Sequence, residues 1–232
     1  FILHSGTTQV LYLFTRAGQC ATIPVQQLPQ INDPPEGVPF NTLCALKPQD
    51  EITAVLSLPN GLETGFLFLA SEGGQVKRIR MEDLPGISSN AFTVMNVGDD
   101  DRLGWVFATS GQNEIILASS QGQAIRFSED EVRPTGLPAG GMRGIKLAEQ
   151  RDRVVGAGIY MENQYFWTIS DDGMAKVSPL SEYPLQGRAG SGVLTMRLPK
   201  ESREVAAGTV GRQDDNIVVL TNKKKPRYMR IG

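Results

Sequence analysis

The sequence has very little of the chemistry that catalytic and metal sites require. Its 232 residues include one histidine, His4, and two cysteines, Cys20 and Cys44. One histidine cannot form a multi-histidine metal site, and no residue pattern around it suggests a Ser-His-Asp or Cys-His catalytic group. The two cysteines lack the spacing of metal ligands and are predicted to be buried thiols, as in a reducing cytoplasm. We therefore expect no catalytic residue, no metal and no cofactor in this chain.

Long hydrophobic runs and a phosphate-binding loop are also missing. No apolar run approaches the ~20 residues that a membrane-spanning helix needs, no signal peptide opens the chain, and no GxxxxGK[ST] motif occurs. The net charge is −2, whereas a dedicated nucleic-acid-binding domain is usually basic. The run Asp99–Asp101 is interpreted as a hairpin turn rather than a divalent-ion site. Composition thus predicts an ordinary globular chain in the cytoplasm.

Glycine and proline are abundant, with 25 and 14 residues, and they punctuate a repeat. A hairpin motif recurs as LFTRAGQCAT (13–22), LASEGGQVKR (69–78), LASSQGQAIR (117–126) and TISDDGMAKV (168–177). The glycines of its turn, Gly18, Gly74, Gly122 and Gly173, follow one another at intervals of 56, 48 and 51 residues. Strand-sized apolar runs at a period near 50 predict an all-β, propeller-like array of four-stranded blades.

The repeats divide a single domain, 1–232, into four full units and partial ends. The full units cover about 9–60, 64–111, 113–163 and 164–213, and a partial one covers 214–232. Residues 1–5 match the last strand of a further repeat, and 216–231 match a first hairpin. Since no initiator methionine is present either, we interpret the chain as a fragment of a larger protein. A single blade cannot bury both of its faces, so function should belong to the assembled array and its rim.

Charged residues are distributed unevenly over the repeats. The returning strands of the hairpins carry bases and no acid, namely Lys77, Arg78, Arg80, Arg126, Lys176, Arg227 and Arg230. The turns between the last two strands of each repeat are mostly acidic, and the run Lys223–Lys225 extends the basic positions. Because equivalent positions of stacked blades lie on equivalent parts of the rim, this pattern predicts a basic band that could contact phosphate. The alternative is that these bases only discourage pairing between strand edges.

The third and fourth repeats contain motifs specific enough to name a family. Residues 132–147 read VRPTGLPAGGMRGIKL and precede Val154–Val155–Gly156, and residues 186–192 read QGRAGSG. They resemble the blade signature V-R-P-x-G-R-x-A-x-G-V-R-G-I-x-L and the gyrase box Q-R-R-G-G-K-G of the C-terminal domain of bacterial type II topoisomerase A subunits, those of DNA gyrase and topoisomerase IV. The box is degenerate here: Gly187 and Ser191 replace its Arg and Lys, and Leu137 replaces an Arg of the blade signature. The degenerate box comprises Gln186, Gly187, Arg188, Ala189, Gly190, Ser191 and Gly192.

The resemblance implies a β-pinwheel, a propeller-like fold in which neighbouring blades exchange strands. It implies a non-catalytic domain that bends or wraps duplex DNA to support supercoiling, while the cleavage and ATP sites of the topoisomerase lie in other domains. The implied partners are double-stranded DNA, the remainder of the topoisomerase polypeptide and, through it, the B subunit, at the bacterial nucleoid. The candidate phosphate contacts are Lys77, Arg78, Arg80, Arg126, Arg143, Lys176, Arg188, Lys223, Lys224, Lys225 and Arg227. Two other functions stay open: a protein-interaction platform without nucleic-acid binding, and a small-ligand or carbohydrate propeller enzyme, which the lack of catalytic groups disfavours.

Overall fold

Short β-strands make up almost all of the regular structure. The computed structural model describes residues 3–31, 33, 36–62, 64–148, 151–198 and 202–220, and the backbone of 226–230. The four repeats begin with the hairpins β1 (Gln9–Thr15) and β2 (Gln19–Pro24), β4 (Phe66–Ser71) and β5 (Gln75–Arg80), β8 (Glu114–Ser119) and β9 (Gln123–Ser128), and β12 (Tyr165–Ser170) and β13 (Ala175–Pro179). They end with the strands β3 (Ile52–Pro59), β7 (Leu103–Thr109), β11 (Val154–Ile159) and β15 (Val205–Gly211).

Shorter elements lie in the long connections that follow the hairpins. Three are two-residue strands, β6 (Phe92–Thr93), β10 (Met142–Arg143) and β14 (Val193–Leu194). The others are 3-10 turns, η1 (Val25–Gln27), η3 (Phe40–Thr42), η4 (Met81–Asp83), η5 (Glu129–Glu131) and η6 (Leu180–Glu182). The chain continues into a last hairpin, β16 (Asn216–Leu220) and β17 (Pro226–Arg230), as the sequence predicts. In the described ranges no helix is long and apolar enough to span a membrane.

Each of the first three blades is built from two consecutive repeats. The strand orders are β3-β1-β2-β6 in blade one, β7-β4-β5-β10 in blade two and β11-β8-β9-β14 in blade three, while blade four contains β15-β12-β13. The two-residue strands, which we call donor strands, come from the repeat that follows the other three strands of their blade. This exchange is the β-pinwheel arrangement expected above. The third repeat thus contributes Met142–Arg143 to the preceding blade, where this short strand pairs with β5.

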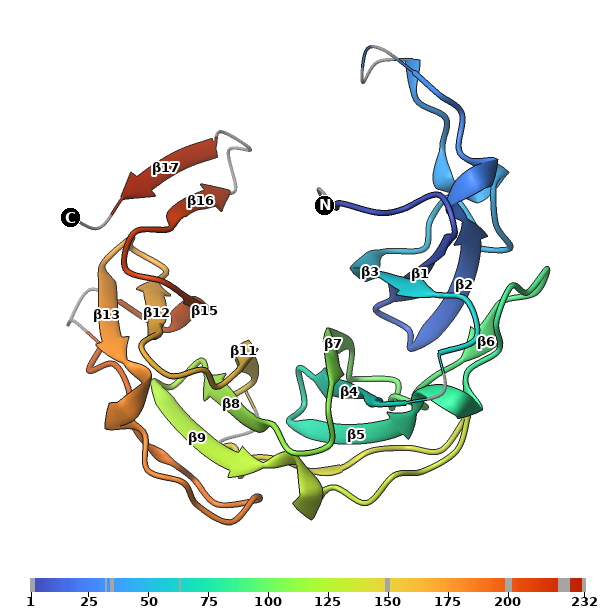
Figure 1. The fold of residues 1–232 in the computed structure, drawn as a ribbon. Coiled ribbons are helices and arrows are strands. Elements are labelled where there is room, and N and C mark those ends of the chain that lie inside the picture. The colour runs from blue at the N-terminus through green and yellow to red at the C-terminus, as the bar shows by residue number, and fades with distance from the viewer. Residues whose placement is uncertain are drawn as a thin grey trace.

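The blades follow one another along an open arc (Figure 1). The strands β3, β7 and β11 line its concave side, whereas β2, β5 and β9 lie toward its convex side. Blades three and four are joined through β11 and β15, which pair in parallel at Gly156 and Gly208. Residues 3–6 are not in a strand, which corrects that part of the strand predicted for residues 1–5; Phe1 and Ile2 lie outside the described residues.

Apolar side chains fill the spaces between successive blades. Because neighbouring residues of a strand point to opposite faces, one strand supplies two interfaces. In β8, Ile115 and Leu117 belong to the cluster between blades two and three, whereas Ile116 and Ala118 belong to the cluster between blades three and four. All four side chains are fully buried. Each blade is therefore stabilised by burying its two faces against its neighbours.

The donor strands are held by the carbonyl group of the hairpin glycine. The Gly122 carbonyl accepts hydrogen bonds from the amides of Thr195, at 2.8 Å, and Met196, at 3.3 Å. Gly122 has a φ of +78°, and a Cβ added there would lie 2.2 Å from the Met196 carbonyl oxygen. A side chain at this position would thus suffer both backbone strain and a collision with the donor segment.

The comparison of Gly122→Ala with Gly173→Ala separates these two effects. Gly173 has a φ of +94°, but nothing lies within 4 Å of its added Cβ. We expect Gly173→Ala to lower the free energy of unfolding by about 1 kcal/mol, and Gly122→Ala by about 3 kcal/mol or more. Urea denaturation of the two variants and the parent chain measures the difference. Equal losses would show that the donor contact contributes nothing to stability.

Candidate nucleic-acid interface

Lys77 lies inside the molecule rather than on its rim. The residue is 1% exposed, and its Nζ donates hydrogen bonds to the carbonyl oxygens of Val94 at 2.8 Å, Gly136 at 3.0 Å and Ala139 at 2.8 Å. Burial lowers the pKa of its amine from 10.5 to about 8. The expectation that Lys77 contacts phosphate is therefore corrected: its amine fastens the connections of two successive repeats to β5.

Arg78 is likewise engaged within the fold. It is 7% exposed, and its guanidinium carbon lies 4.5 Å from the centroid of the Phe66 ring. Its Nη1 donates to the Gly111 carbonyl at 3.2 Å and lies 3.9 Å from Oε2 of the fully buried Glu129. This arginine compensates a buried carboxylate, so its predicted role at a DNA surface is also corrected.

Arg126 occupies the corresponding position of blade three. Its Nε donates to Glu114 Oε2 at 2.5 Å, and its Nη1 donates to the Tyr183 carbonyl at 3.0 Å. Its guanidinium carbon lies 3.4 Å from the centroid of the Tyr160 ring. With its side chain only 14% exposed, Arg126 joins strands and connections instead of facing solvent. Lys77, Arg78 and Arg126 of the basic band predicted on the returning strands are therefore engaged inside the fold.

Two other returning-strand bases do reach the surface. The Arg80 side chain is 53% exposed, with its Nε 3.9 Å from Glu82 Oε1. Lys176 is exposed as well, although its Nζ donates to the Thr195 carbonyl at 2.6 Å. Arg227 lies on β17, where only the backbone is described, and Lys223, Lys224 and Lys225 lie outside the described residues.

The degenerate box packs against the donor segment of the preceding repeat. The Ala189 amide donates to the Gly144 carbonyl at 2.7 Å, and the Lys146 amide donates to the Gly190 carbonyl at 2.8 Å. Arg188 Nη1 donates to the Arg143 carbonyl at 2.9 Å. These bonds bring Arg143, Lys146 and Arg188 together next to β10, at the outer edge of blade two. We call these three residues the rim cluster.

The rim cluster contains exposed positive charge. Arg143 and Lys146 are exposed and Arg188 is partly exposed. Glu131 reduces the charge locally, since its Oε2 accepts the Arg188 amide at 3.0 Å and its carbonyl accepts Arg188 Nε at 3.1 Å. The guanidinium of Arg188 is thereby held in place beside Arg143. This geometry suits contacts to a negatively charged ligand that follows the rim, such as a phosphate backbone.

Sequence reasoning missed several exposed bases of the connections. Lys146 is one, and Arg133 and Arg197 are two more. Lys146 and Arg197 hold the fifth position of the segments 142–147 and 193–198, where the segment 92–97 has the neutral Asn96. Aligning these three segments would have revealed Lys146 and Arg197 from the sequence. The search for bases on the returning strands could not find them, because the segments lie in the connections.

Carboxylates of the acidic turns accept hydrogen bonds from backbone amides and from one hydroxyl. Asp101 Oδ1 accepts the Gly73 amide at 2.6 Å and the Arg102 amide at 2.7 Å. Asp152 Oδ1 accepts the Ser120 hydroxyl at 2.8 Å and the Gln121 amide at 3.2 Å. Within the residues that the structure describes, no group of three or more His, Cys, Asp or Glu side chains is placed to hold a metal ion.

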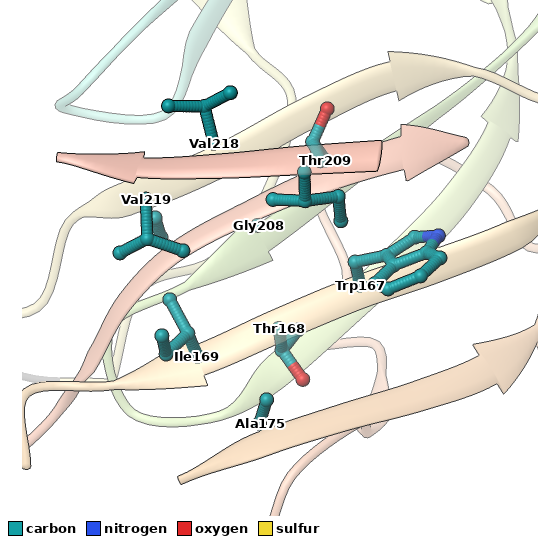
Figure 2. Close-up of a pocket in the computed structure, with 10 residues that line it drawn as sticks. Trp167, Thr168, Ile169, Ala175, Gly208, Thr209, Val218 and Val219 are labelled. Atoms are coloured by element: carbon teal, nitrogen blue, oxygen red, sulfur yellow. The ribbon is translucent and has the colours of Figure 1, made fainter. Parts of the chain in front are cut away.

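An apolar cavity of about 170 Å³ lies between blade four and the last hairpin. Figure 2 shows Val219 of β16 on the side of its strand that faces Ile169 of β12, with Trp167 of β12 and Thr209 of β15 alongside. Its lining has no ionisable side chain. The cavity thus belongs to an interface between blades and has no groups for acid, base or nucleophilic chemistry.

An arc of strand-exchanged blades with a basic cluster on its outer edge defines this chain as a β-pinwheel domain. The family model of the DNA gyrase C-terminal domain, beta-propeller, matches residues 65–110, 113–160 and 165–207, more than half of the chain. The chain belongs to this family.

Individual relatives agree with this assignment. The chain is 30% identical to the DNA gyrase A protein of Haemophilus influenzae over 248 residues, and 31% identical to that of Dehalogenimonas lykanthroporepellens over 223 residues, with 95% of the chain covered in both. It spans only 28% and 27% of the lengths of these relatives. The crystal structure of the C-terminal domain of DNA topoisomerase IV superposes with a TM-score of 0.89 at 26% identity, covering 97% of this chain and 70% of that one.

Acylation of lysines in the folded chain tests the placement of the basic residues. We expect Lys146 to react many times faster than Lys77, because the Lys77 amine is buried and holds three carbonyl groups. Mass spectrometry of peptides after brief treatment with an acylating reagent measures both rates. In denaturant the difference should vanish. Comparable reaction of Lys77 and Lys146 in the folded chain would contradict the buried position of Lys77.

Proposed function

We propose that this chain is a non-catalytic DNA-binding domain that bends or wraps duplex DNA along the convex rim of its arc. The rim cluster of Arg143, Lys146 and Arg188 would contact phosphates. Further contacts would come from the exposed bases Arg80, Arg133, Lys176 and Arg197, and from Lys223, Lys224, Lys225 and Arg227. The observation that carries the proposal is the convergence of the rim cluster, created by hydrogen bonds between the box and the donor segment next to β10.

The shape of the molecule supports bending in particular. Successive blades place their outer strands along a curved outline (Figure 1), and a duplex that follows this outline must bend. Bending a site of a few tens of base pairs costs on the order of 1–6 kcal/mol, which added phosphate contacts offset. Contacts to the backbone alone are sufficient for such binding, because they position a duplex without reading its sequence.

The residues of the box support weak rather than tight wrapping. Gly187 and Ser191 stand where the gyrase box has bases, and Glu131 partly compensates Arg188. Each missing base removes one phosphate neutralisation and its released counterion, so affinity should be modest and strongly dependent on salt. The negative net charge of the whole chain is compatible with this, because binding depends on the charge along the rim.

In the wider context, the domain would deliver DNA to the other domains of a type II topoisomerase. We propose the remainder of the topoisomerase polypeptide and, through it, the B subunit of the enzyme as partners, with supercoiling at the nucleoid in the bacterial cytoplasm as the process served. Cleavage, religation and ATP hydrolysis would take place in the other domains of the complete enzyme. Ligation of nicked circles in the presence of the chain would report any wrapping as a change in linking number.

A salt series with the double variant Arg143→Gln, Lys146→Gln tests the proposed interface. If both residues neutralise phosphates, the slope of log K against log salt should fall by about 1.8. Fluorescence anisotropy with a labelled duplex of mixed sequence measures this slope. Affinity should fall similarly for unrelated sequences, because phosphate contacts carry no sequence information.

The matched control is Lys47→Gln, Arg102→Gln, which removes the same charge from exposed positions outside the donor segments. The control should retain nearly the whole slope. Equal slopes for the two double variants would exclude the rim cluster as the contact surface. Absence of binding by the parent chain even at low salt would reject the function and favour a protein-interaction platform.

A further inference from the structure

The junction between blades three and four differs from the other junctions on the concave side of the arc. There β11 and β15 pair in parallel at Gly156 and Gly208, so the two blades form one sheet of seven strands. The strands β3 and β7 instead end the sheets of blades one and two. In the described part of the chain, the inner strands of neighbouring blades therefore pair with each other at only this one junction.

The start of the inner strand is the same at all three junctions. The first residue of β11 or β15, and likewise of β7, donates its amide to a hairpin carbonyl of the preceding blade. These bonds are Leu103 to Arg16 at 2.8 Å, Val154 to Glu72 at 2.7 Å and Val205 to Ser120 at 2.8 Å. The difference between the junctions therefore arises farther along the inner strands.

Two glycines of β11 permit the close approach of β15. A Cβ added at Gly156 would lie 2.6 Å from the Gly208 carbonyl oxygen, and one added at Gly158 would lie 2.4 Å from Val210 Cγ2. The Val210 side chain could move aside, but the contact at Gly208 is with backbone. A side chain at position 156 would therefore displace β15 itself.

Blade two has large side chains at the same two positions. Trp105 and Phe107 lie opposite the residues of β4 that are equivalent to the partners of Gly156 and Gly158 in β8. Both side chains pack against the apolar cluster between blades two and three. The inner edge of that junction is thus occupied by aromatic rings, whereas the same place between blades three and four has only backbone.

Farther from the concave side, both junctions contain a buried aromatic pair. The ring centroids of Phe68 and Phe127 are 6.3 Å apart between blades two and three, and those of Phe166 and Tyr183 are 5.9 Å apart between blades three and four. All four residues are at most 2% exposed. Large side chains therefore separate the blades in the interior of both junctions, and the contrast in size lies at the inner strands.

This contrast gives the two junctions different shapes. Hydrogen-bonded strands lie about 4.8 Å apart, whereas sheets packed face to face lie about 10 Å apart. The junction between blades three and four is held at the shorter distance on its concave side and is filled by aromatic rings farther out, so its faces diverge toward the rim. Between blades two and three, Trp105 and Phe107 keep the concave side open, and the faces are closer to parallel.

We infer that the residues at these two inner-strand positions set the angle between consecutive blades, and that the rim turns more sharply from blade three to blade four than from blade two to blade three. This inference deepens the proposed function and rests on it where DNA is concerned. A duplex that follows the rim is bent most where it passes the junction of blades three and four. Gly156 and Gly158 thus determine the bend without touching DNA.

Exchanging the residues between the two blades tests this inference. The double variant Gly156→Trp, Gly158→Phe gives blade three the side chains of blade two, and Gly156→Ala is a milder form of it. Trp105→Ala, Phe107→Ala makes the opposite change in blade two. Gly98→Trp is the control, because Gly98 is exposed and has nothing within 4 Å of an added Cβ.

The expected change in angle is large enough to measure. Widening the inner edge by about 5 Å, across a blade about 14 Å wide, rotates one blade by roughly 20°. Small-angle X-ray scattering of the free chain should therefore show a larger radius of gyration for Gly156→Trp, Gly158→Phe, a slightly larger one for Gly156→Ala and a smaller one for Trp105→Ala, Phe107→Ala. Gly98→Trp should match the parent chain. Thermal melting verifies that each variant is folded.

Energy transfer between dyes on the two ends of a duplex of about 40 base pairs reports the bend on binding. Transfer should fall for Gly156→Trp, Gly158→Phe and rise for Trp105→Ala, Phe107→Ala. No charge is altered, so the slope of log K against log salt should stay that of the parent chain. Loss of stability alone would not move the bend in opposite directions in the two double variants.

The two measurements separate the ways in which the inference could fail. An unchanged radius of gyration in the folded double variants would overturn the control of the angle by these residues. A changed radius with an unchanged bend in a duplex that still binds would overturn the link between the angle and DNA. A parent chain that binds no DNA would reject the proposed function and with it the bend, whereas scattering would still decide the angle.

Discussion

The exchange of short strands between consecutive repeats is the constraint on which the rest of the structure depends. In each of blades one to three, the carbonyl group of a left-handed glycine accepts two amides from the following repeat, as Gly122 does from Thr195 and Met196. The donor covers a strand edge that would otherwise expose unpaired backbone groups. Because the donor strand belongs to the next repeat, it also connects successive blades covalently. This connection fixes the position of each blade relative to the next, and with it the apolar contacts between them.

The same requirement explains the two kinds of basic residue in this chain. Carbonyl groups of the connections that pack against a hairpin are not paired with a neighbouring strand, so they need other hydrogen-bond donors. The side chains of Lys77 and Arg126 supply these donors from within the fold. On the outside of the connections, Arg143 and Lys146 face solvent. The returning-strand bases Lys77, Arg78 and Arg126 thus support the fold, whereas Arg80 and Lys176 on the same kind of strand are exposed, as are the donor-segment bases Arg143 and Lys146.

In the degenerate box, different residues determine the path of the backbone and the charge of the rim. Its backbone still binds the neighbouring donor segment through Ala189 and Gly190, which needs no particular side chain. Ala189 even holds a φ of 65°, a conformation in which the glycine of the family motif is unstrained. The positions that lost their bases, Gly187 and Ser191, affect the charge of the rim rather than the path of the chain. A domain can therefore keep the pinwheel architecture while its affinity for a polyanion changes.

The sequence by itself determined the class of fold and the family. The register of Gly18, Gly74, Gly122 and Gly173 revealed the repeat, and short apolar runs such as the one containing Ile115 and Ile116 revealed strands buried on both faces. These are local properties, set by the preference of glycine for positive φ and by the two-residue period of a strand. Only the tertiary structure decided which blade each donor strand joins and which bases are accessible, because both depend on contacts between residues far apart in the chain. Lys77 and Lys146 are equally plausible surface lysines in the sequence, and the difference between them arises from the carbonyl groups of Val94, Gly136 and Ala139 that converge on only one of them.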